Sequence, residues 1–251
     1  MFITDAERNA IETCVANYKN FVLVINSGCS IDMSFVDEIP DIGAILFICQ
    51  LGTEGGNAFA DVISGKVTPS GKLTDTWAKK YADIPFHDEF SYLNGNVEEE
   101  YYKEGIYVGY RYFDSFDVEP CYSFGYGLSY TEFSVFGAGV SVEGTTVKLN
   151  AIVTNVGTDY SGKEVVQAYL SAPAGKLHKE YQSLVAFAKT KELMPAESET
   201  LQMSFDMTEV ASYDEERASY ILEAGEYILR LGTSSRNTVP GCVGFLLIIY
   251  F

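Results

Sequence analysis

The first fifty residues contain one amphipathic pattern and two continuous apolar runs. Apolar side chains recur at spacings of three and four over residues 3–18, which predicts a helix, and Thr4 and Glu7 have the spacing of a capping box at its start. Residues 21–25 and 44–48 are apolar throughout. Runs of this kind predict strands that are buried on both faces.

Two shorter helices are predicted on either side of the second strand. Residues 34–39 precede that strand, and residues 55–64 follow it and are stopped by Gly65, a residue suited to end a helix. Helices and strands that alternate in this order indicate α/β layering with mainly parallel strands.

From residue 77 to residue 124 the regular pattern fades. This stretch holds His87, the acidic run 98–100 and many tyrosines. A connection of this length inside a compact protein is usually functional or disordered. The tyrosines favour an ordered, packed loop over a disordered one.

After Tyr130 the pattern changes to alternation with a period of two. Short apolar runs of this type lie at residues 147–153, 164–170, 182–187, 201–205 and 227–231. Strands at this rhythm predict a β-sandwich of immunoglobulin-like or fibronectin III-like type. We therefore predict two domains, a partial α/β domain with a long Tyr-rich loop over residues 1–130 and an all-β sandwich over residues 131–251.

The two ends of the chain bear on location. Residues 243–251 are strongly apolar, but a membrane crossing takes roughly 20 residues, so a terminal strand is expected there. Residues 1–19 mix acidic and apolar positions and do not resemble a signal peptide. The five cysteines stand singly, without a C-x-x-C pair, which predicts reduced thiols and a cytoplasmic protein.

The net charge and the composition narrow the range of ligands and macromolecules that the chain is expected to bind. The net charge of −18 repels phosphate and argues against nucleic acid, whereas a neutral ligand such as a sugar is compatible with it. His87 and His178 are the two histidines and are far apart in the chain, so neither a metal nor another cofactor is expected. The 18 tyrosines suit a carbohydrate surface, but they suit β-strands and half-buried loops as well.

Four stretches carry a specific pattern. They are the segment 50–73, with the form QLGTEGGNAFADV followed by GKVTPSGKL; the segment 102–114, YKEGIYVGYRYFD; the segment 123–133, SFGYGLSYTEF; and the sandwich motifs at 154–157, 162–167, 225–227 and 232–236. In this order they resemble glycoside hydrolase family 3, of β-glucosidase type. The resemblance covers nearly the whole chain and implies part of that family's C-terminal α/β sandwich domain followed by its fibronectin type III-like domain.

The resemblance also implies which groups perform the chemistry. A retaining mechanism uses two carboxylates about 5 Å apart, one as nucleophile and one as general acid/base. In the family, the nucleophilic Asp lies on a (β/α)₈ barrel, and the acid/base Glu lies upstream of the segment that matches residues 5–19 here. Neither motif has a counterpart in this sequence, and a barrel alone needs roughly 250 residues. No catalytic residue is therefore assigned within the chain.

Three charged residues within the motifs remain candidates. Glu54 could act in catalysis, but a carboxylate bonded to backbone N–H groups at a helix start is favoured. Glu104 and Arg111 could contact substrate, but a buried ion pair that fixes the long loop is favoured.

Two functions follow from these patterns. The first is a portion of a glycosidase that hydrolyses β-glucosides or oligosaccharides once the missing barrel, as a domain or a separate chain, is present. The alternative is a non-catalytic module that binds carbohydrate or docks a partner. A Ser-His-Asp hydrolase is disfavoured because the chain has no G-x-S-x-G elbow. Apolar patches and open sheet edges in the N-terminal half further predict homo-oligomers of the isolated chain.

Overall fold

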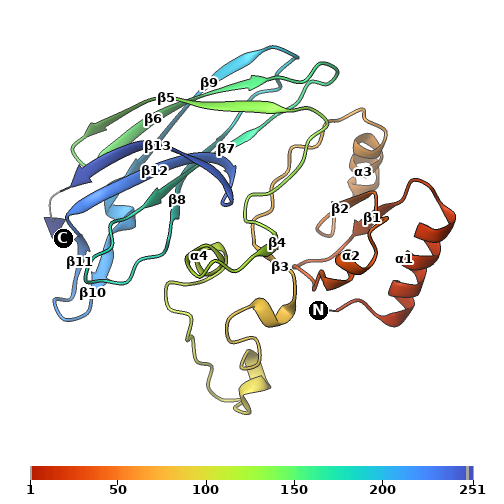
Figure 1. The fold of residues 1–251 in the computed structure, drawn as a ribbon, viewed down its shortest axis with the longest axis horizontal. Coiled ribbons are helices and arrows are strands. Elements are labelled where there is room, and N and C mark those ends of the chain that lie inside the picture. The colour runs from red at the N-terminus through yellow and green to blue at the C-terminus, as the bar shows by residue number, and fades with distance from the viewer. Residues whose placement is uncertain (1, 247–248, 251) are drawn as a thin grey trace. The chain divides into compact units, whose positions relative to one another are not determined.

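The chain forms two compact units that interleave along the sequence. The computed structural model describes residues 2–246 and 249–250 (Figure 1). Unit 1 contains Met1–Val67, Asp75–Gly105 and Glu119–Tyr122. Unit 2 contains the remaining segments, which are Thr68–Thr74, Ile106–Val118 and Ser123–Phe251. This division differs from a single boundary at residue 130, because two segments of the first half pack on the sandwich.

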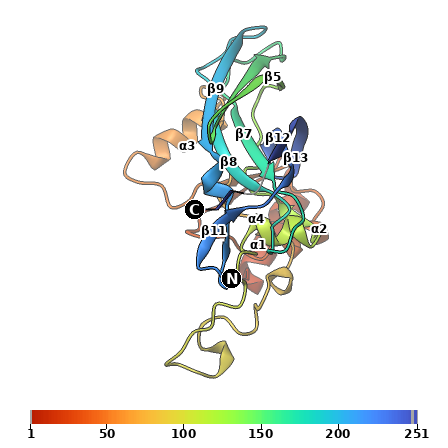
Figure 2. The same cartoon turned by 90° about the vertical axis from the view of Figure 1, so that its left-hand side faces the viewer.

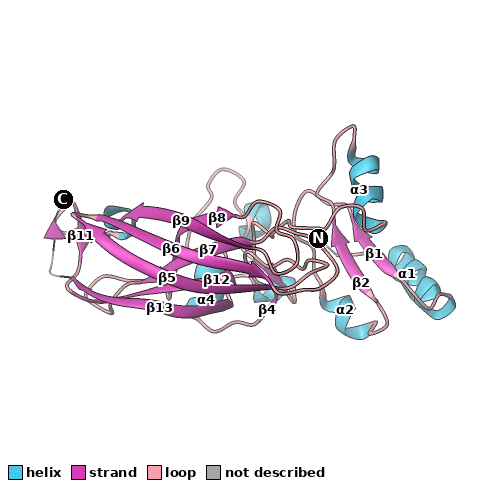
Figure 3. Ribbon diagram, turned by 90° about the horizontal axis from the view of Figure 1, so that it is seen from above, coloured by secondary structure: helices cyan, strands magenta, loops and turns pink. Residues whose placement is uncertain are grey.

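Unit 1 begins with the predicted alternation of helices and strands. Its elements are α1 (Asp5–Asn17), β1 (Val22–Ile25), α2 (Ser34–Glu38), β2 (Ala44–Phe47) and α3 (Gly55–Ile63). Strands β1 and β2 pair in parallel, as predicted, and α1 and α2 lie beside this pair (Figure 3).

Local signals set the ends of these helices. At the start of α1, the Thr4 amide donates to Glu7 Oε2 at 2.7 Å and the Glu7 amide donates to Thr4 Oγ1 at 3.3 Å, which confirms the capping box. After α3, Gly65 adopts φ 74°, a left-handed conformation that stops the helix at little cost.

The β1–β2 sheet is covered less completely than its sequence predicts. Val22 and Val24 share one face of β1 and are 42% and 36% exposed, whereas Ile25 on the other face is buried. The expectation of burial on both faces is therefore wrong for both strands, because this side of β1 is exposed and β2 has no fully buried residue. Helix α3 likewise buries none of its side chains, and Ile63 is 49% exposed. Both surfaces match the predicted apolar patches, and self-association through them stays a prediction.

The long connection contains short elements rather than one loop. They are β3 (Trp77–Ala78), η1 (Tyr81–Asp83), η2 (Ser91–Asn94), α4 (Tyr110–Ser115) and β4 (Pro120–Tyr122). Strands β3 and β4 pair antiparallel, and the fully buried Trp77 ring lies 4.9 Å from the ring of Phe47 and 6.4 Å from that of Tyr122. The core of unit 1 is built around this tryptophan.

Unit 2 is a two-sheet sandwich, seen from two directions in Figures 1 and 2. One sheet has the order β5-β6-β9, and the other has the order β13-β12-β7-β8. The strands are β5 (Phe133–Glu143), β6 (Thr146–Asn155), β7 (Val165–Ser171), β8 (Ser183–Lys189), β9 (Ser198–Asp206), β12 (Gly225–Ser234) and β13 (Asn237–Leu246). A three-plus-four arrangement of antiparallel strands confirms the predicted fibronectin III-like sandwich.

Alternate residues of these strands form the sandwich core. In β6, Leu149, Ala151 and Val153 are almost completely buried and meet Val166 and Ala168 of β7 in one hydrophobic cluster. Between β9 and β12 the chain adds η3 (Met207–Val210), β10 (Ser212–Asp214) and β11 (Ser219–Leu222), and β11 pairs with β14 (Ile249–Tyr250). The period-two pattern thus predicted the buried face correctly.

The apolar end of the chain continues β13 to Leu246 and contributes β14, in agreement with a terminal strand. Residues 247, 248 and 251 of this predicted strand lie outside the described residues. None of the helices in the described part of the chain combines the length and apolar character that a membrane crossing requires.

Candidate functional site at the carboxyl ends of the parallel strands

The loops that follow β1 and β2 are held together by a side chain. Asn26 Oδ1 accepts a hydrogen bond from the Gln50 amide at 2.9 Å, and the Ile48 amide extends the strand pairing by donating to the Ile25 carbonyl at 3.0 Å. Open α/β sheets bind their ligands beyond the carboxyl ends of their strands. This edge is therefore the first place in unit 1 to look for a functional site.

The loop after β2 has an unusual backbone. Cys49 and Gln50 adopt φ 42° and φ 50°, a left-handed conformation that costs a non-glycine residue about 1–2 kcal/mol. A Cβ on Gly28 would lie 3.1 Å from Gln50 Oε1, so a glycine there leaves room for the Gln50 side chain. Strained residues of this kind cluster at functional sites. The Asn26 hydrogen bond is one contact that holds this backbone in place.

Glu54 lies at the start of α3 but does not cap it. Its carboxylate accepts a hydrogen bond from Asn57 Nδ2 at 2.5 Å and makes no hydrogen bond to the helix N–H groups. The prediction that Glu54 bonds to backbone N–H groups at the helix start is therefore wrong. The reason is its backbone: φ −91° and ψ 8° differ from the extended conformation in which a cap side chain folds back over the first turn. Glu54 is exposed, and its site holds no second carboxylate in contact with it among the described residues.

One of the three glycines in this motif, Gly55, is required by the close approach of a neighbouring side chain. A Cβ at Gly55 would lie 2.3 Å from Leu51 Cβ, which only glycine avoids. Gly52 and Gly56 have open space around them. The tight turn into α3 therefore depends on one glycine of the three.

Asp32 is a buried carboxylate in the loop after β1 that the sequence patterns did not single out. Its Oδ1 accepts from the Ser34 amide at 3.0 Å and from the Ser34 hydroxyl, and its Oδ2 accepts from the Tyr81 amide at 2.7 Å. Burial acts to raise the pKa of Asp32, but the hydrogen bonds from Ser34 and Tyr81 outweigh it and lower the pKa below its ordinary value. Asp32 thus ties this loop to η1 in its ionised form.

We expect Asp32→Asn to destabilise unit 1 by about 1–3 kcal/mol at pH 7, because the amide that replaces one oxygen would face a backbone N–H donor. The folded pKa is depressed, so this contribution is present above the unfolded pKa and is lost as the pH falls below about 4. Trp77 is the single tryptophan and lies in the same unit, so its fluorescence reports urea unfolding there. The difference in free energy of unfolding between wild type and Asp32→Asn should narrow from pH 7 to pH 3. The exposed Asp41→Asn control should have a free energy of unfolding near that of wild type at both pH values. A gap that is equal at both pH values contradicts the assignment.

Arg111 and Glu104 do not form the predicted ion pair. Arg111 lies in α4, and its Nε is 3.8 Å from Glu180 Oε1 of the sandwich unit. Glu104 belongs to unit 1 and has no ion pair among the described residues. The hydroxyl of Tyr110, the residue before Arg111, accepts from the Leu184 amide at 2.8 Å, which turns the start of α4 toward strand β8. Among the described residues, Arg111 is thus paired with Glu180 and not with Glu104.

Asp114 is the one carboxyl group in the described part of the chain whose pKa is clearly raised, and burial is the main cause. Its side chain is 3% exposed and is enclosed by Arg236 Nε at 2.6 Å and Gln182 Nε2 at 3.0 Å. A general acid must reach its substrate. Asp114 cannot do so and is structural. The described residues also contain no cluster of three histidine, cysteine or acidic side chains that could hold a metal.

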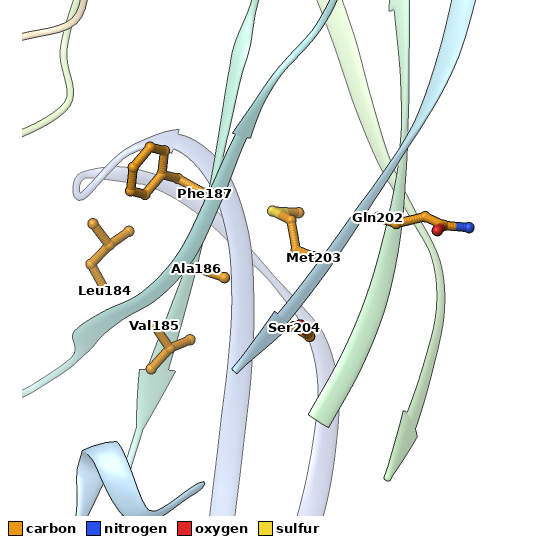
Figure 4. Close-up of a pocket in the computed structure, with 7 residues that line it drawn as sticks. All are labelled: Leu184, Val185, Ala186, Phe187, Gln202, Met203 and Ser204. Carbon is orange, nitrogen blue, oxygen red and sulfur yellow. The ribbon is translucent and has the colours of Figure 1, made fainter. Parts of the chain in front are cut away.

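A groove of about 420 Å³ lies at the open edge of the sandwich, along strands β8 and β9 (Figure 4). It is lined by residues 184–187 and 202–204. Gln202 and Ser204 are its polar side chains, and no lining residue carries a carboxylate. The groove cannot provide the paired acids that glycoside hydrolysis requires.

Comparison with known proteins accounts for these observations. Residues 1–110 match the glycosyl hydrolase family 3 C-terminal domain, and residues 164–235 match a fibronectin type III-like domain. The chain belongs to glycoside hydrolase family 3. The solved structure of a β-glucosidase from Paenibacillus barengoltzii matches 99% of the chain, with 39% sequence identity and a TM-score of 0.92.

Curated relatives in the family have more than one activity in their names. Beta-glucosidase A of Butyrivibrio fibrisolvens is 38% identical over 94% of this chain, and an exo-alpha-(1->6)-L-arabinopyranosidase of Bifidobacterium breve is 35% identical over 90%. The chain spans 31% and 29% of these relatives and 28% of the Paenibacillus protein. It thus corresponds to less than a third of a family 3 glycosidase and lacks the catalytic barrel.

Proposed function

We propose that this chain forms the C-terminal part of a β-glucosidase that hydrolyses β-glucosides or oligosaccharides with retention of configuration. The observation that carries the proposal is the match to β-glucosidases across both units. It agrees with the carboxylates of the chain, because Glu54 is exposed without a second carboxylate beside it and Asp114 is enclosed by other side chains. The nucleophile and the acid/base then come from the parts of the enzyme that this chain does not contain.

Within such an enzyme, the bare face of unit 1 is the surface that meets the rest of the protein. Parallel sheets are normally covered on both faces, and Val22 and Val24 leave one side of β1 uncovered. Contiguous apolar patches on a protein surface mark interaction sites. The strained turn at Cys49 and Gln50 lies at the carboxyl end of the neighbouring strand.

A chimera tests the proposal. This chain would replace the matching C-terminal segment of β-glucosidase A from Butyrivibrio fibrisolvens, and release of the aryl group from aryl β-glucosides would be measured. We expect clear turnover. Val24→Lys within the chimera should abolish assembly and activity, because it buries a charge at the seam. The matched control Val156→Lys, at a residue 52% exposed in unit 2, should keep activity.

The sugar is tested in the same assay. Because one relative is named as an arabinopyranosidase, aryl α-L-arabinopyranosides belong in the panel beside the β-glucosides. A folded chimera that turns over none of these compounds contradicts the proposal.

A non-catalytic carbohydrate-binding role is the second candidate, and one feature favours it. Tyr101 and Tyr102 are 58% and 89% exposed, and the Tyr101 hydroxyl donates to Glu99 Oε2 at 2.6 Å, which fixes the ring with its face accessible. Exposed rings of this kind stack on sugars. Binding of cello-oligosaccharides by the isolated chain, lost in Tyr102→Ala, would favour this role. For location, the free and exposed Cys29 and Cys49 suit a reducing compartment, and we propose the cytoplasm.

A further inference from the structure

The sandwich of unit 2 has four edge strands, because both of its sheets are open. They are β5 and β9 in one sheet and β13 and β8 in the other. An edge strand leaves one row of backbone N–H and C=O groups without a partner strand, and such a row pairs readily with another chain. Proteins prevent this pairing with bulges, prolines and lysines at their edges. The four edges of this sandwich differ in how far they are protected in this way.

Three of the four edge strands are interrupted. The pairing of β5 with β6 shifts register at Ala138, and the pairing of β8 with β7 shifts register at Val185. The pairing of β13 with β12 shifts register twice, and β13 also contains Pro240. A bulge bends and twists its strand, and a proline removes one donor from the row. These three edges are therefore poor templates for another strand.

Strand β9 is the exception. Its nine residues, Ser198–Asp206, pair with β6 without a shift of register. The segment contains neither proline nor lysine. Gln202 and Ser204 are exposed and uncharged on its outer face, whereas Leu201 and Met203 are buried on its inner face. Strand β9 is therefore a regular edge without the features that prevent pairing.

The side-chain alternation of β9 matches a second, antiparallel copy of the same strand. In an antiparallel pair, residues that lie directly opposite each other point to the same face of the sheet. Pairing over all nine residues places Gln202 opposite Gln202 of the second copy and Thr200 opposite Ser204. It also places Leu201 opposite Met203, so the inner faces of both strands remain on their own cores. Two three-stranded sheets would thus become one continuous sheet.

The charges of β9 permit this register. Its two charged residues are Glu199 and Asp206, which lie opposite Phe205 and Ser198 of the second copy. Like charges directly opposite each other destabilise a strand pair, and this register avoids them. The Glu199 carboxylate is also engaged within its own chain, where it accepts a hydrogen bond from the Lys191 amide at 2.8 Å. The strand is therefore complementary to itself in charge as well as in side-chain pattern.

The groove along β8 and β9 supplies apolar surface at the same edge (Figure 4). Its lining includes Leu184, Phe187 and Met203, and the Phe187 side chain is 69% exposed. Where β9 of one copy pairs with β9 of another, the two grooves meet, and both Phe187 rings lose exposure to water. Backbone hydrogen bonds between strands mostly replace bonds to water, so burial of apolar surface is needed to make association favourable.

We propose that unit 2 carries a self-association surface at β9, through which two copies of the chain pair strand to strand. The occupant of this edge is a second copy of the chain, because the strand is self-complementary and the adjoining groove offers apolar surface to bury. The apolar faces of β1 and α3 belong to unit 1 and are not used in this contact. The inference goes beyond the proposed enzyme function and does not depend on hydrolysis.

Sedimentation velocity of the full 251-residue chain over a range of concentrations tests the proposal. Wild type should pass from monomer to dimer as the concentration rises. Gln202→Lys should raise the dissociation constant of the dimer roughly tenfold or more, because the two lysines face each other at the centre of the strand pair. The variant lowers the net negative charge of −18, so general repulsion between the chains cannot explain weaker pairing.

Two further variants separate this surface from others. Asn150→Lys is the matched control, because Asn150 lies opposite Gln202 in β6 and the change replaces an exposed amide with the same charge one strand away from the edge. It should dimerise as wild type does. Val24→Lys, on the exposed face of β1, should also keep the dimer. A dimer that is lost in Val24→Lys and kept in Gln202→Lys would assign the contact to unit 1 and overturn the proposal.

Hydrogen exchange measured by mass spectrometry locates the contact. In wild type, residues 198–206 should exchange more slowly at high concentration than at low concentration, while residues 133–143 of β5 should not change. A wild-type chain that stays monomeric at every concentration overturns the proposal, and so does a dimer without this protection at β9. The exchange measurement uses wild type, so it decides the question even if Gln202→Lys does not fold. An inactive chimera would refute the proposed enzyme function and leave this result unaffected.

Discussion

The purified 251-residue chain is expected to leave aryl β-glucosides unhydrolysed above the background rate. Glycosidases of the retaining type need two carboxylates about 5 Å apart, one of them protonated and in reach of the leaving group. Asp114 is enclosed by Arg236, Asp32 is ionised and engaged with Ser34 and Tyr81, and Glu54 is exposed without a carboxylate partner in the described structure. Enzymes of this class exceed the uncatalysed rate by at least about a millionfold, so the difference is large.

The control for this result is the complete assembly. The chimera with the rest of a β-glucosidase should hydrolyse the same compounds at an ordinary enzymatic rate, and Glu54→Gln in the isolated chain should change nothing. Turnover by the purified chain that disappears in Glu54→Gln or in Glu104→Gln would overturn the assignment. It would place an active site within these residues, since losing one member of a catalytic set removes most of the rate.

The periodicity of apolar residues predicted the helices and strands well because most of these elements bury one face. The alternation of Leu149, Ala151 and Val153 reflects a strand with one buried face, and the Thr4–Glu7 capping box is a contact within four residues. Such signals are local in sequence and survive without knowledge of the fold. The exposed face of β1 shows the limit of prediction from periodicity. A continuous apolar run indicates that a strand is suited to packing on both faces, but it does not tell whether the described residues include an element that packs there.

The candidate site was predicted less well, because its contacts join residues far apart in sequence. An ion pair between Glu104 and Arg111 is the favoured prediction for the motif at 102–114, yet the partner of Arg111 is Glu180. Asp32 gave one local signal, an aspartate two residues before Ser34 at a helix start, but its bond to the Tyr81 amide crosses 49 positions. No spacing rule connects Arg236 to Asp114, which are 122 residues apart.

Two of the sequence motifs meet through glycine, and only the structure reveals why. Gly71 lies in the PSGKL stretch and Gly127 in the FGYGLSY stretch. A Cβ added to Gly127 would lie 2.2 Å from the Gly71 carbonyl oxygen and 3.1 Å from Lys72 Cδ. The closest obstacle is backbone, which cannot rotate away as a side chain does. The two motifs therefore depend on each other, although 55 residues separate Lys72 from the Gly127 carbonyl that it bonds.

We expect Gly127→Ala to destabilise unit 2 by about 3 kcal/mol or more, at the upper end of the range for overpacked sites, because the added methyl group must displace the Gly71 backbone and loosen the Lys72 contacts. Gly139→Ala is the matched control. It lies in β5 of the same unit, has no atom within 4 Å of its Cβ position and should change stability by no more than about 0.5 kcal/mol. Urea unfolding followed by the far-ultraviolet circular dichroism of the strands compares the two variants. A Gly127→Ala protein as stable as Gly139→Ala would mean that the two motifs can separate without loss, and that their contact does not hold segment 68–74 on the sandwich.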